Sequence, residues 1–179
     1  GNWRQNNPQR ARSNNAIGLY RNNFSYEQLE EIIKLNQGDN DISFIFVHDE
    51  YETSNPCREI TFRPVLEDGR TGIQMCNLTE INASACNSRT TFLKACRAAS
   101  ILGTLQAGYT DFPYLGKNTE ELIRKEALIG VSITGWMNQP SLFNAELLEE
   151  GAELIKKTNE ELALILGINP AARTTTVKP

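Results

Sequence analysis

The feature that most limits the possible folds is the continuous apolar run "ISFIFV" at residues 42–47, which is rich in β-branched and aromatic side chains. Such a run predicts a strand that is buried on both faces, as is typical of α/β sheets. The segments "AIGLY", "IQMCNLTEI", "IGVSITG" and the terminal "ARTTTVKP" predict further strands. A sheet with several apolar strands is therefore expected.

Helical segments separate these strands. Ser25 and Gln28 form a capping-box pattern at the start of one helix, which Gly38 is expected to end. Apolar residues three or four apart predict a long helix from Ser88 to about residue 107. Two more helices are predicted, one from Asn118 or Thr119 and one capped by Asn144 and ended by Gly167 and Pro170. The alternation of strands with long helices indicates the α/β class.

Length and charge limit the classes of function. The chain has 179 residues, which suits one domain or a piece of a larger one, and its net charge is −4. This charge favours neither direct nucleic-acid binding nor an anionic membrane. We see neither a membrane-spanning run nor a signal peptide, so a cytoplasmic location is expected. Residues 1–21 contain four arginines and no acid, which fits a solvated basic arm or a contact with phosphate or an acidic partner.

The cysteines do not suggest a metal centre. The chain has four cysteines and one histidine, His48, and no Cys-x-x-Cys pair, so no metal site is expected. In a cytoplasmic protein the thiols would be reduced. Cys86 and Cys96 fall on or before a predicted helix and are expected to be ordinary buried thiols.

The loop "TSNPCREI" at residues 53–60 carries the residues with the most chemistry. Asn55, Cys57 and Glu59 alternate, so in an extended segment they would share one face, and Pro56 would stiffen it. A carboxylate can act as a general base, an amide can orient a hydroxyl, and a thiol can act as a nucleophile or in one-electron chemistry. Polar cysteine catalysis would need a base such as His48. A lone histidine more often has a structural role or lies on the surface. The spacing alone also fits a structural loop.

Several stretches together resemble one family. "NPCREI" resembles the thiyl-radical loop of ribonucleotide reductases, in which Asn-Pro-Cys-Gly-Glu is common among the cobalamin-dependent enzymes. "MCNLTEIN" is similar to the strand with one reducing cysteine, and "ARTTTVKP" to the segment that leads into the substrate-phosphate loop. "IGVSITG" and "RSNNA" also resemble pieces of the same large subunit, in the same order.

This resemblance implies a fold and a set of roles. The fold would be part of a ten-stranded α/β barrel with a central cysteine-bearing finger loop. Cys57 would carry the radical, Glu59 would be the base at the ribose 3′-hydroxyl, and Cys76 would be one of two reducing thiols. The substrate would contact Ser54, Asn55 and Pro179, where the phosphate loop would begin. The reaction would convert ribonucleotides to 2′-deoxyribonucleotides for DNA synthesis.

The departures from the family suggest a fragment. Arg58 replaces the usual glycine, and the second reducing cysteine of the family lies upstream of Gly1. Residues 1–179 would therefore be the central segment of a split reductase, inactive until other chains complete it. Adenosylcobalamin, bound mainly by those other parts, and an external thioredoxin-like dithiol reductant are the expected cofactor and partner. A non-catalytic assembly subunit and a glycyl-radical relative are the alternatives.

Overall fold

The computed structural model describes residues 3–9, 16–35 and 43–177. The chain divides into two compact units, Gly1–Arg63 and Pro64–Pro179. Gly38, Ile42, Pro179 and the arginines at positions 10 and 12 lie outside the described residues. Within the described part, every helix is too short or too polar to cross a membrane.

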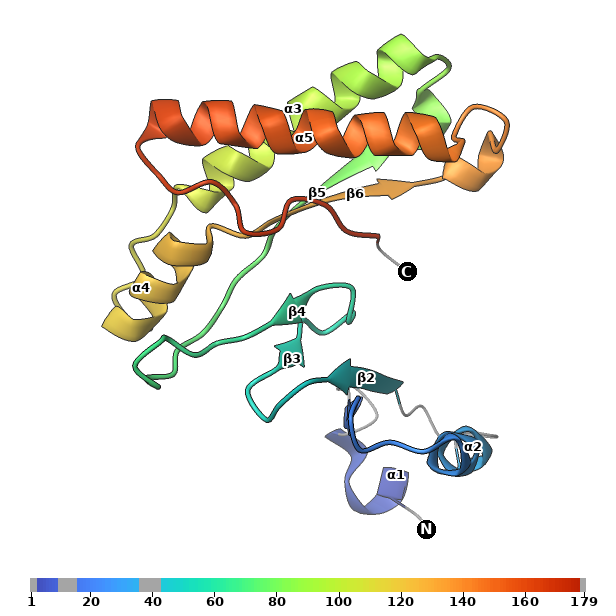
Figure 1. Ribbon diagram of the computed structural model, residues 1–179, viewed down its shortest axis with the longest axis vertical. Coiled ribbons are helices and arrows are strands. Elements are labelled where there is room, and N and C mark those ends of the chain that lie inside the picture. The colour runs from blue at the N-terminus through green and yellow to red at the C-terminus, as the bar shows by residue number, and fades with distance from the viewer. Residues whose placement is uncertain (1–2, 10–15, 36–42, 178–179) are drawn as a thin grey trace. The chain divides into compact units, whose positions relative to one another are not determined.

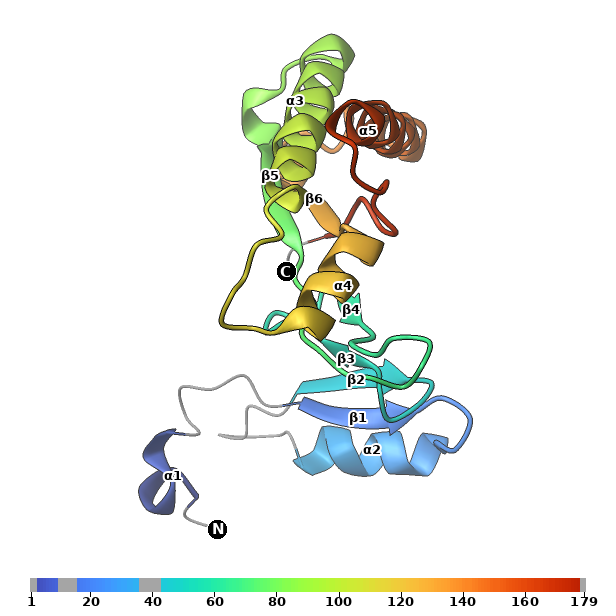
Figure 2. The same cartoon turned by 90° about the vertical axis from the view of Figure 1, so that its left-hand side faces the viewer.

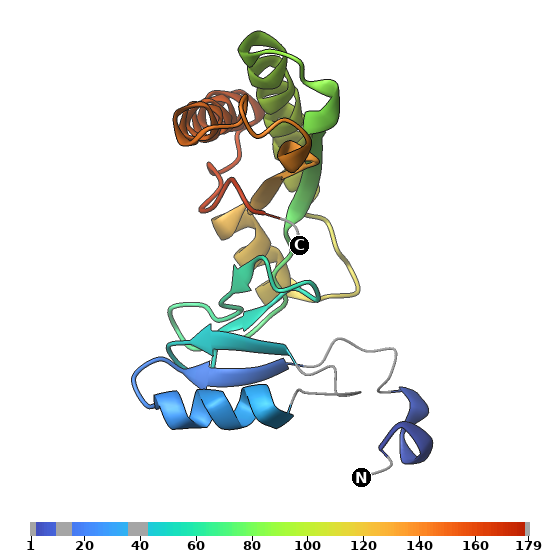
Figure 3. The same cartoon turned by 90° about the vertical axis from the view of Figure 1, so that its right-hand side faces the viewer.

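The first unit is built on a parallel pair of strands. After the short helix α1 (Trp3–Asn6), β1 (Ala16–Tyr20) pairs in parallel with β2 (Ser43–Val47), and α2 (Tyr26–Leu35) lies between them in the sequence. Parallel neighbours need such a crossover, and α2 runs alongside the two strands (Figures 2 and 3). The predicted capping box is confirmed, because Ser25 N donates to Gln28 Oε1 at 2.9 Å and Gln28 N donates to Ser25 Oγ at 3.3 Å.

The prediction that residues 42–47 are buried on both faces is wrong for the described part of this strand. Val47 is 4% exposed, but Phe46 is 41% exposed. The reason is that β2 belongs to a sheet of two strands, so only part of its surface is covered. Phe46 instead packs edge-to-face with Phe24 and Phe44, at ring-centroid distances of 6.0 and 5.8 Å.

The second unit places two long helices over a second parallel pair. β5 (Asn77–Asn82) pairs with β6 (Ile129–Thr134), and α3 (Arg89–Ala107), α4 (Lys117–Glu126) and α5 (Ala145–Leu166) complete the order β5–α3–α4–β6–α5. Figure 1 shows α3 and α5 side by side over one face of the strands. The predicted cap Asn144 is confirmed, as is the helix end at Gly167 with φ +68°. Ser88, where the long helix was predicted to start, is the N-cap of α3. The helix predicted to start at Asn118 or Thr119 is α4, which begins just before them, at Lys117.

The mixed α/β class is therefore confirmed, while the extent of the sheets differs from the expectation. The described residues form three two-stranded sheets. The terminal segment pairs with β6 only locally, because Val131 N donates to Thr174 O at 2.9 Å and Thr176 N donates to Val131 O at 3.1 Å. A ten-stranded barrel would need strands beyond the part of the chain described here.

Buried polar side chains hold this terminal segment to the helices. Asn159, which is 1% exposed, donates from Nδ2 to Thr104 Oγ1 at 2.9 Å and accepts from Ala171 N at 2.8 Å. Ser100 Oγ donates to Ile155 O at 2.7 Å and adds a second link between α3 and α5. Because buried polar groups must be hydrogen-bonded, these contacts favour one register of the two helices and the following chain.

The close approach of α3 and α5 leads to a stability prediction. A Cβ atom on Gly151 would lie 2.7 Å from Phe92 Cε1 and 3.1 Å from Cys96 Sγ. Phe92 has little freedom to move, because its ring packs edge-to-face on Phe143 with centroids 5.2 Å apart. We expect Gly151→Ala to lower the free energy of unfolding by about 1–3 kcal/mol. Urea unfolding followed by circular dichroism measures this change.

Gly103→Ala is the matched control, since it makes the same change on α3. The nearest heavy atom to a Cβ there is Ile129 Cβ at 3.4 Å, which is close to an ordinary contact. The control should be as stable as the parent or more so, because alanine favours helix over glycine by about 1 kcal/mol. Equal stability of the two variants would contradict the tight packing at Gly151.

Candidate functional site

The segment that carries the candidate residues is a short β-hairpin. β3 (Thr53–Ser54) pairs antiparallel with β4 (Thr61–Phe62), with Thr53 opposite Phe62 and Ser54 opposite Thr61. Asn55 closes the loop from both ends. Its backbone N donates to Ile60 O at 3.1 Å, and its side-chain Oδ1 accepts from Ile60 N at 3.1 Å. The carboxamide of Asn55 therefore replaces a backbone carbonyl in the hairpin ladder.

Inside this loop the chain makes a tight turn. Arg58 N donates to Asn55 O at 3.0 Å, so residues 55–58 form a β-turn with Pro56 at its second position, where proline is favoured. Cys57 follows at the turn and is exposed. Arg58 has φ +68°, in the left-handed region that favours glycine. The residue that departs from the family pattern thus occupies the backbone conformation for which glycine is best suited.

The turn corrects the expectation that three side chains share one face. Asn55 is buried, Cys57 is exposed and Glu59 is partly buried, with both carboxylate oxygens shielded from solvent. The alternation rule applies to extended backbone only, and the turn at Pro56 removes that condition. The three residues are still neighbours in one loop, which places an amide, a thiol and a carboxylate within five consecutive positions.

A hollow of about 610 Å³ lies beside this loop within the first unit. Ser54 and Asn55, both predicted to contact the substrate, are among its lining residues, whereas Cys57 and Glu59 are not. The full lining consists of Ala16, Gly18, Ile45, Glu52, Thr53, Ser54, Asn55, Pro56 and Arg58. Its volume is in the range of small-molecule sites in proteins.

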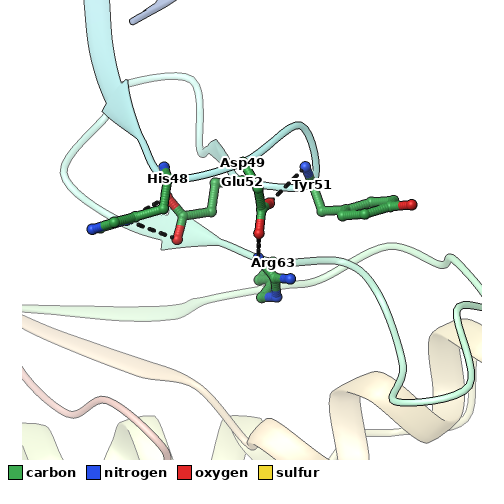
Figure 4. Close-up of polar contacts among 5 residues, drawn as sticks. All are labelled: His48, Asp49, Tyr51, Glu52 and Arg63. Carbon is green, nitrogen blue, oxygen red and sulfur yellow. Dashed lines mark hydrogen bonds and ion pairs between the residues drawn. The ribbon is translucent and has the colours of Figure 1, made fainter. Parts of the chain in front are cut away.

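Glu52 also lines the hollow, which the sequence analysis does not predict. Its side chain is 16% exposed, and its Oε2 accepts from His48 N at 2.8 Å, while His48 Nδ1 lies 3.1 Å from the same oxygen (Figure 4). The hydrogen bond from the His48 backbone is the main reason that the pKa of Glu52 lies below its ordinary value of 4.5. One signal in the sequence could identify Glu52. It lies two positions before Ser54, and side chains two positions apart in an extended segment point to the same side.

A second ion pair braces the turn that leads into the hairpin. Arg63, which follows β4, pairs with Asp49, and Asp49 Oδ1 accepts from Tyr51 N at 2.9 Å (Figure 4). The hydrogen bond from Arg63 is the main cause that lowers the pKa of the Asp49 carboxyl. His48 itself is 63% exposed, in agreement with its interpretation as a surface histidine.

The remaining cysteines belong to the second unit. Cys76 is partly buried and lies one residue before β5, so the prediction that it stands within a strand is wrong by one position. Cys86 and Cys96 are buried in the core, as expected. Burial raises the pKa of Cys86, and it is also the largest cause that raises the pKa of Cys96 to about 12.

These environments predict a clear order of thiol reactivity on the native chain. Only the thiolate attacks alkylating reagents, and at pH 8 a thiol with a pKa of about 12 is ionised to roughly one part in 10⁴. We expect iodoacetamide to label the exposed Cys57 in minutes and to spare Cys86 and Cys96 until denaturant is added. Peptide mass spectrometry after timed quenching measures the four rates. Equal labelling of all four thiols would contradict the packed core.

The donor groups of the chain bear on which cofactor it could hold. Among the described residues, no group of three or more His, Cys, Asp or Glu side chains is placed to hold a metal ion. The hollow is lined by one cation, one carboxylate, an amide, hydroxyls and small apolar groups. This lining fits a small ligand with hydroxyls and an anionic group, and it does not fit a corrin ring.

Comparisons with known proteins found a likeness in structure. The chain resembles the crystal structure of a B-12 dependent (class II) ribonucleotide reductase, with a TM-score of 0.61 and 18% sequence identity. The match covers 98% of this chain and 30% of that chain, so this chain spans less than a third of the reductase. No protein-family model and no curated protein sequence matched. At this level of identity the likeness shows a shared fold over the matched part.

Proposed function

We propose that this chain is the central catalytic segment of a ribonucleotide reductase. The observation that carries the proposal is that a chain resembling part of such an enzyme over 98% of its length places Asn55, Cys57 and Glu59 in one braced hairpin loop. The other parts of the enzyme, on the same or on other polypeptides, would complete the ten-stranded barrel around this finger loop and exclude water and oxidants. The complete enzyme would act in the cytoplasm and supply DNA synthesis.

In the proposed reaction the hairpin residues Cys57 and Glu59 move one hydrogen atom and one proton. Adenosylcobalamin, held by the other parts of the enzyme, supplies the one-electron chemistry that amino-acid side chains lack. The sulfur radical on Cys57 takes the 3′-hydrogen of a ribonucleotide and later returns it. Glu59 accepts the 3′-hydroxyl proton while the 2′-hydroxyl leaves as water. Ser54 and the Asn55 amide hold the ribose hydroxyls.

Two thiols supply the electrons for the reduction. Cys76 and a second cysteine outside this chain give two electrons and two protons and become a disulfide, so that one ribonucleotide yields one deoxyribonucleotide and one water. A thioredoxin-like dithiol then restores the pair. One phosphate of the substrate would be bound by the segment that begins at Pro179.

Assembly of the enzyme tests the proposal. The chain is combined with the products of the reading frames that flank its gene, together with adenosylcobalamin, a dithiol and radiolabelled ribonucleoside di- or triphosphates. Formation of 2′-deoxyribonucleotides over many turnovers is the expected result. Assembly without turnover would instead indicate a non-catalytic subunit, and turnover that needs a glycyl radical would indicate the other alternative.

A single-turnover experiment tests the role of Cys76. When the dithiol is omitted, one product per enzyme should form, together with a new disulfide that contains Cys76. Mass spectrometry of non-reduced peptides detects this bond. A free Cys76 after stoichiometric product formation, or a bridge from Cys76 to Cys86 or Cys96, would remove it from the mechanism.

A further inference from the structure

The strained residue of the hairpin loop points to a role in ligand selection. Among the described residues, Arg58 and Ala127 are the non-glycine residues with positive φ. Ala127 ends α4, a common place for a left-handed residue. At Arg58 the tight turn sets the left-handed conformation, but the turn does not explain why an arginine stands there. A glycine would make the same turn without the steric conflict between Cβ and backbone. Residues kept in unfavourable backbone regions cluster at functional sites, where the side chain is needed.

The surroundings of Arg58 suggest what its side chain does. Arg58 lines the hollow, and its Nη1 donates at 3.4 Å to the carbonyl of Pro56, another lining residue. The other charged lining residue is Glu52, whose carboxylate is engaged by the backbone N–H and the ring of His48. The wall near Ser54 and Asn55 therefore offers groups that suit hydroxyls, while Arg58 supplies the positive charge.

We propose that Arg58 recognises a phosphate group of the ligand in this hollow and makes the chain select a nucleotide over its nucleoside. A guanidinium can donate two parallel hydrogen bonds to a phosphate, which a lysine ammonium matches in charge but not in shape. This inference rests on the proposed function, since it specifies how the substrate of that site is chosen. It also explains why an arginine occupies a turn position suited to glycine.

Binding measurements on the assembled enzyme without a radical source test this role. Isothermal titration gives the dissociation constants of ADP and of adenosine for the parent and for the variants Arg58→Gln, Arg58→Lys and Arg58→Gly. In Arg58→Gln the preference for ADP should fall by about 10- to 100-fold, the range expected for a charged hydrogen-bonded contact. Arg58→Lys should retain a larger share of the preference, and adenosine binding should change little in any variant.

Arg58→Gly provides an independent readout on the isolated 179-residue chain. Removal of the backbone conflict should raise its melting temperature by about 2–5 °C, while the same substitution weakens ADP binding in the complex.

The inference would be overturned by an unchanged ADP preference in Arg58→Gln, by equal loss of ADP and adenosine binding, or by no ADP binding in the parent. If the preference for ADP over adenosine depends on Arg58 but no nucleotide is reduced, the role of Arg58 is supported and the reductase proposal is contradicted.

Discussion

Replacement of Cys57 by serine should abolish the formation of 2′-deoxyribonucleotides in the assembled enzyme. A hydroxyl is close to a thiol in size, so the exposed tip of the hairpin should keep its fold. An oxygen cannot take the place of the sulfur radical, because the O–H bond is much harder to break homolytically than the S–H bond. We therefore expect product below detection in a radiochemical turnover assay, with unchanged assembly on size exclusion.

Cys86→Ser is the matched control for this change. Cys86 is a buried thiol whose Sγ lies 3.5 Å from Asn82 O, and it has no place in the proposed reaction. A serine there should cost about 1–3 kcal/mol of stability and leave the turnover of folded enzyme near that of the parent. Repeated turnover by Cys57→Ser would show that the hairpin cysteine is not the radical-bearing residue.

Replacement of Glu59 by glutamine should slow the reaction by about 10²- to 10⁴-fold, the usual contribution of a general base. Glutamine has the shape of glutamate, and the two side-chain oxygens of Glu59 are shielded from solvent. The amide cannot accept the 3′-hydroxyl proton, so the loss should fall on kcat while the KM for the nucleotide stays close to that of the parent. Steady-state kinetics separates the two constants.

Glu50→Gln serves as the control for the change of charge. Glu50 is an exposed carboxylate in the turn before the hairpin, so its loss alters the net charge equally without touching the loop. Its kcat should match that of the parent. A Glu59→Gln enzyme with a raised KM and an unchanged kcat would indicate that Glu59 only binds the substrate.

Local hydrogen bonds explain why the sequence was sufficient for the helix ends. Ser25 with Gln28 and Asn144 with Leu147 make their caps within three residues, and Gly167 ends α5 through its own backbone conformation. Such features depend on neighbours along the chain and little on the rest of the fold. The same holds for the alternation of strands and helices, which follows from the apolar period.

Contacts between distant residues explain what the sequence did not predict. Asn159 is joined to Thr104 across 55 positions, and no local pattern marks a lone helical asparagine as the group that holds α5 to α3 and to Ala171. The exposure of Phe46 likewise depends on how many strands flank β2. These outcomes require the packed structure, because burial and pairing are properties of the whole unit.

In the candidate site, too, some features follow from the sequence alone and others only from the tertiary structure. The residues "NPCREI" were sufficient to identify the loop and the chemistry of an amide, a thiol and a carboxylate. The tertiary structure decided that the loop turns at Pro56, that Asn55 closes it onto Ile60, and that Glu52 and Arg58 line the hollow beside it. The physical reason is that side-chain type belongs to the residue, whereas direction and exposure belong to the backbone path, which the pairing of β3 with β4 sets.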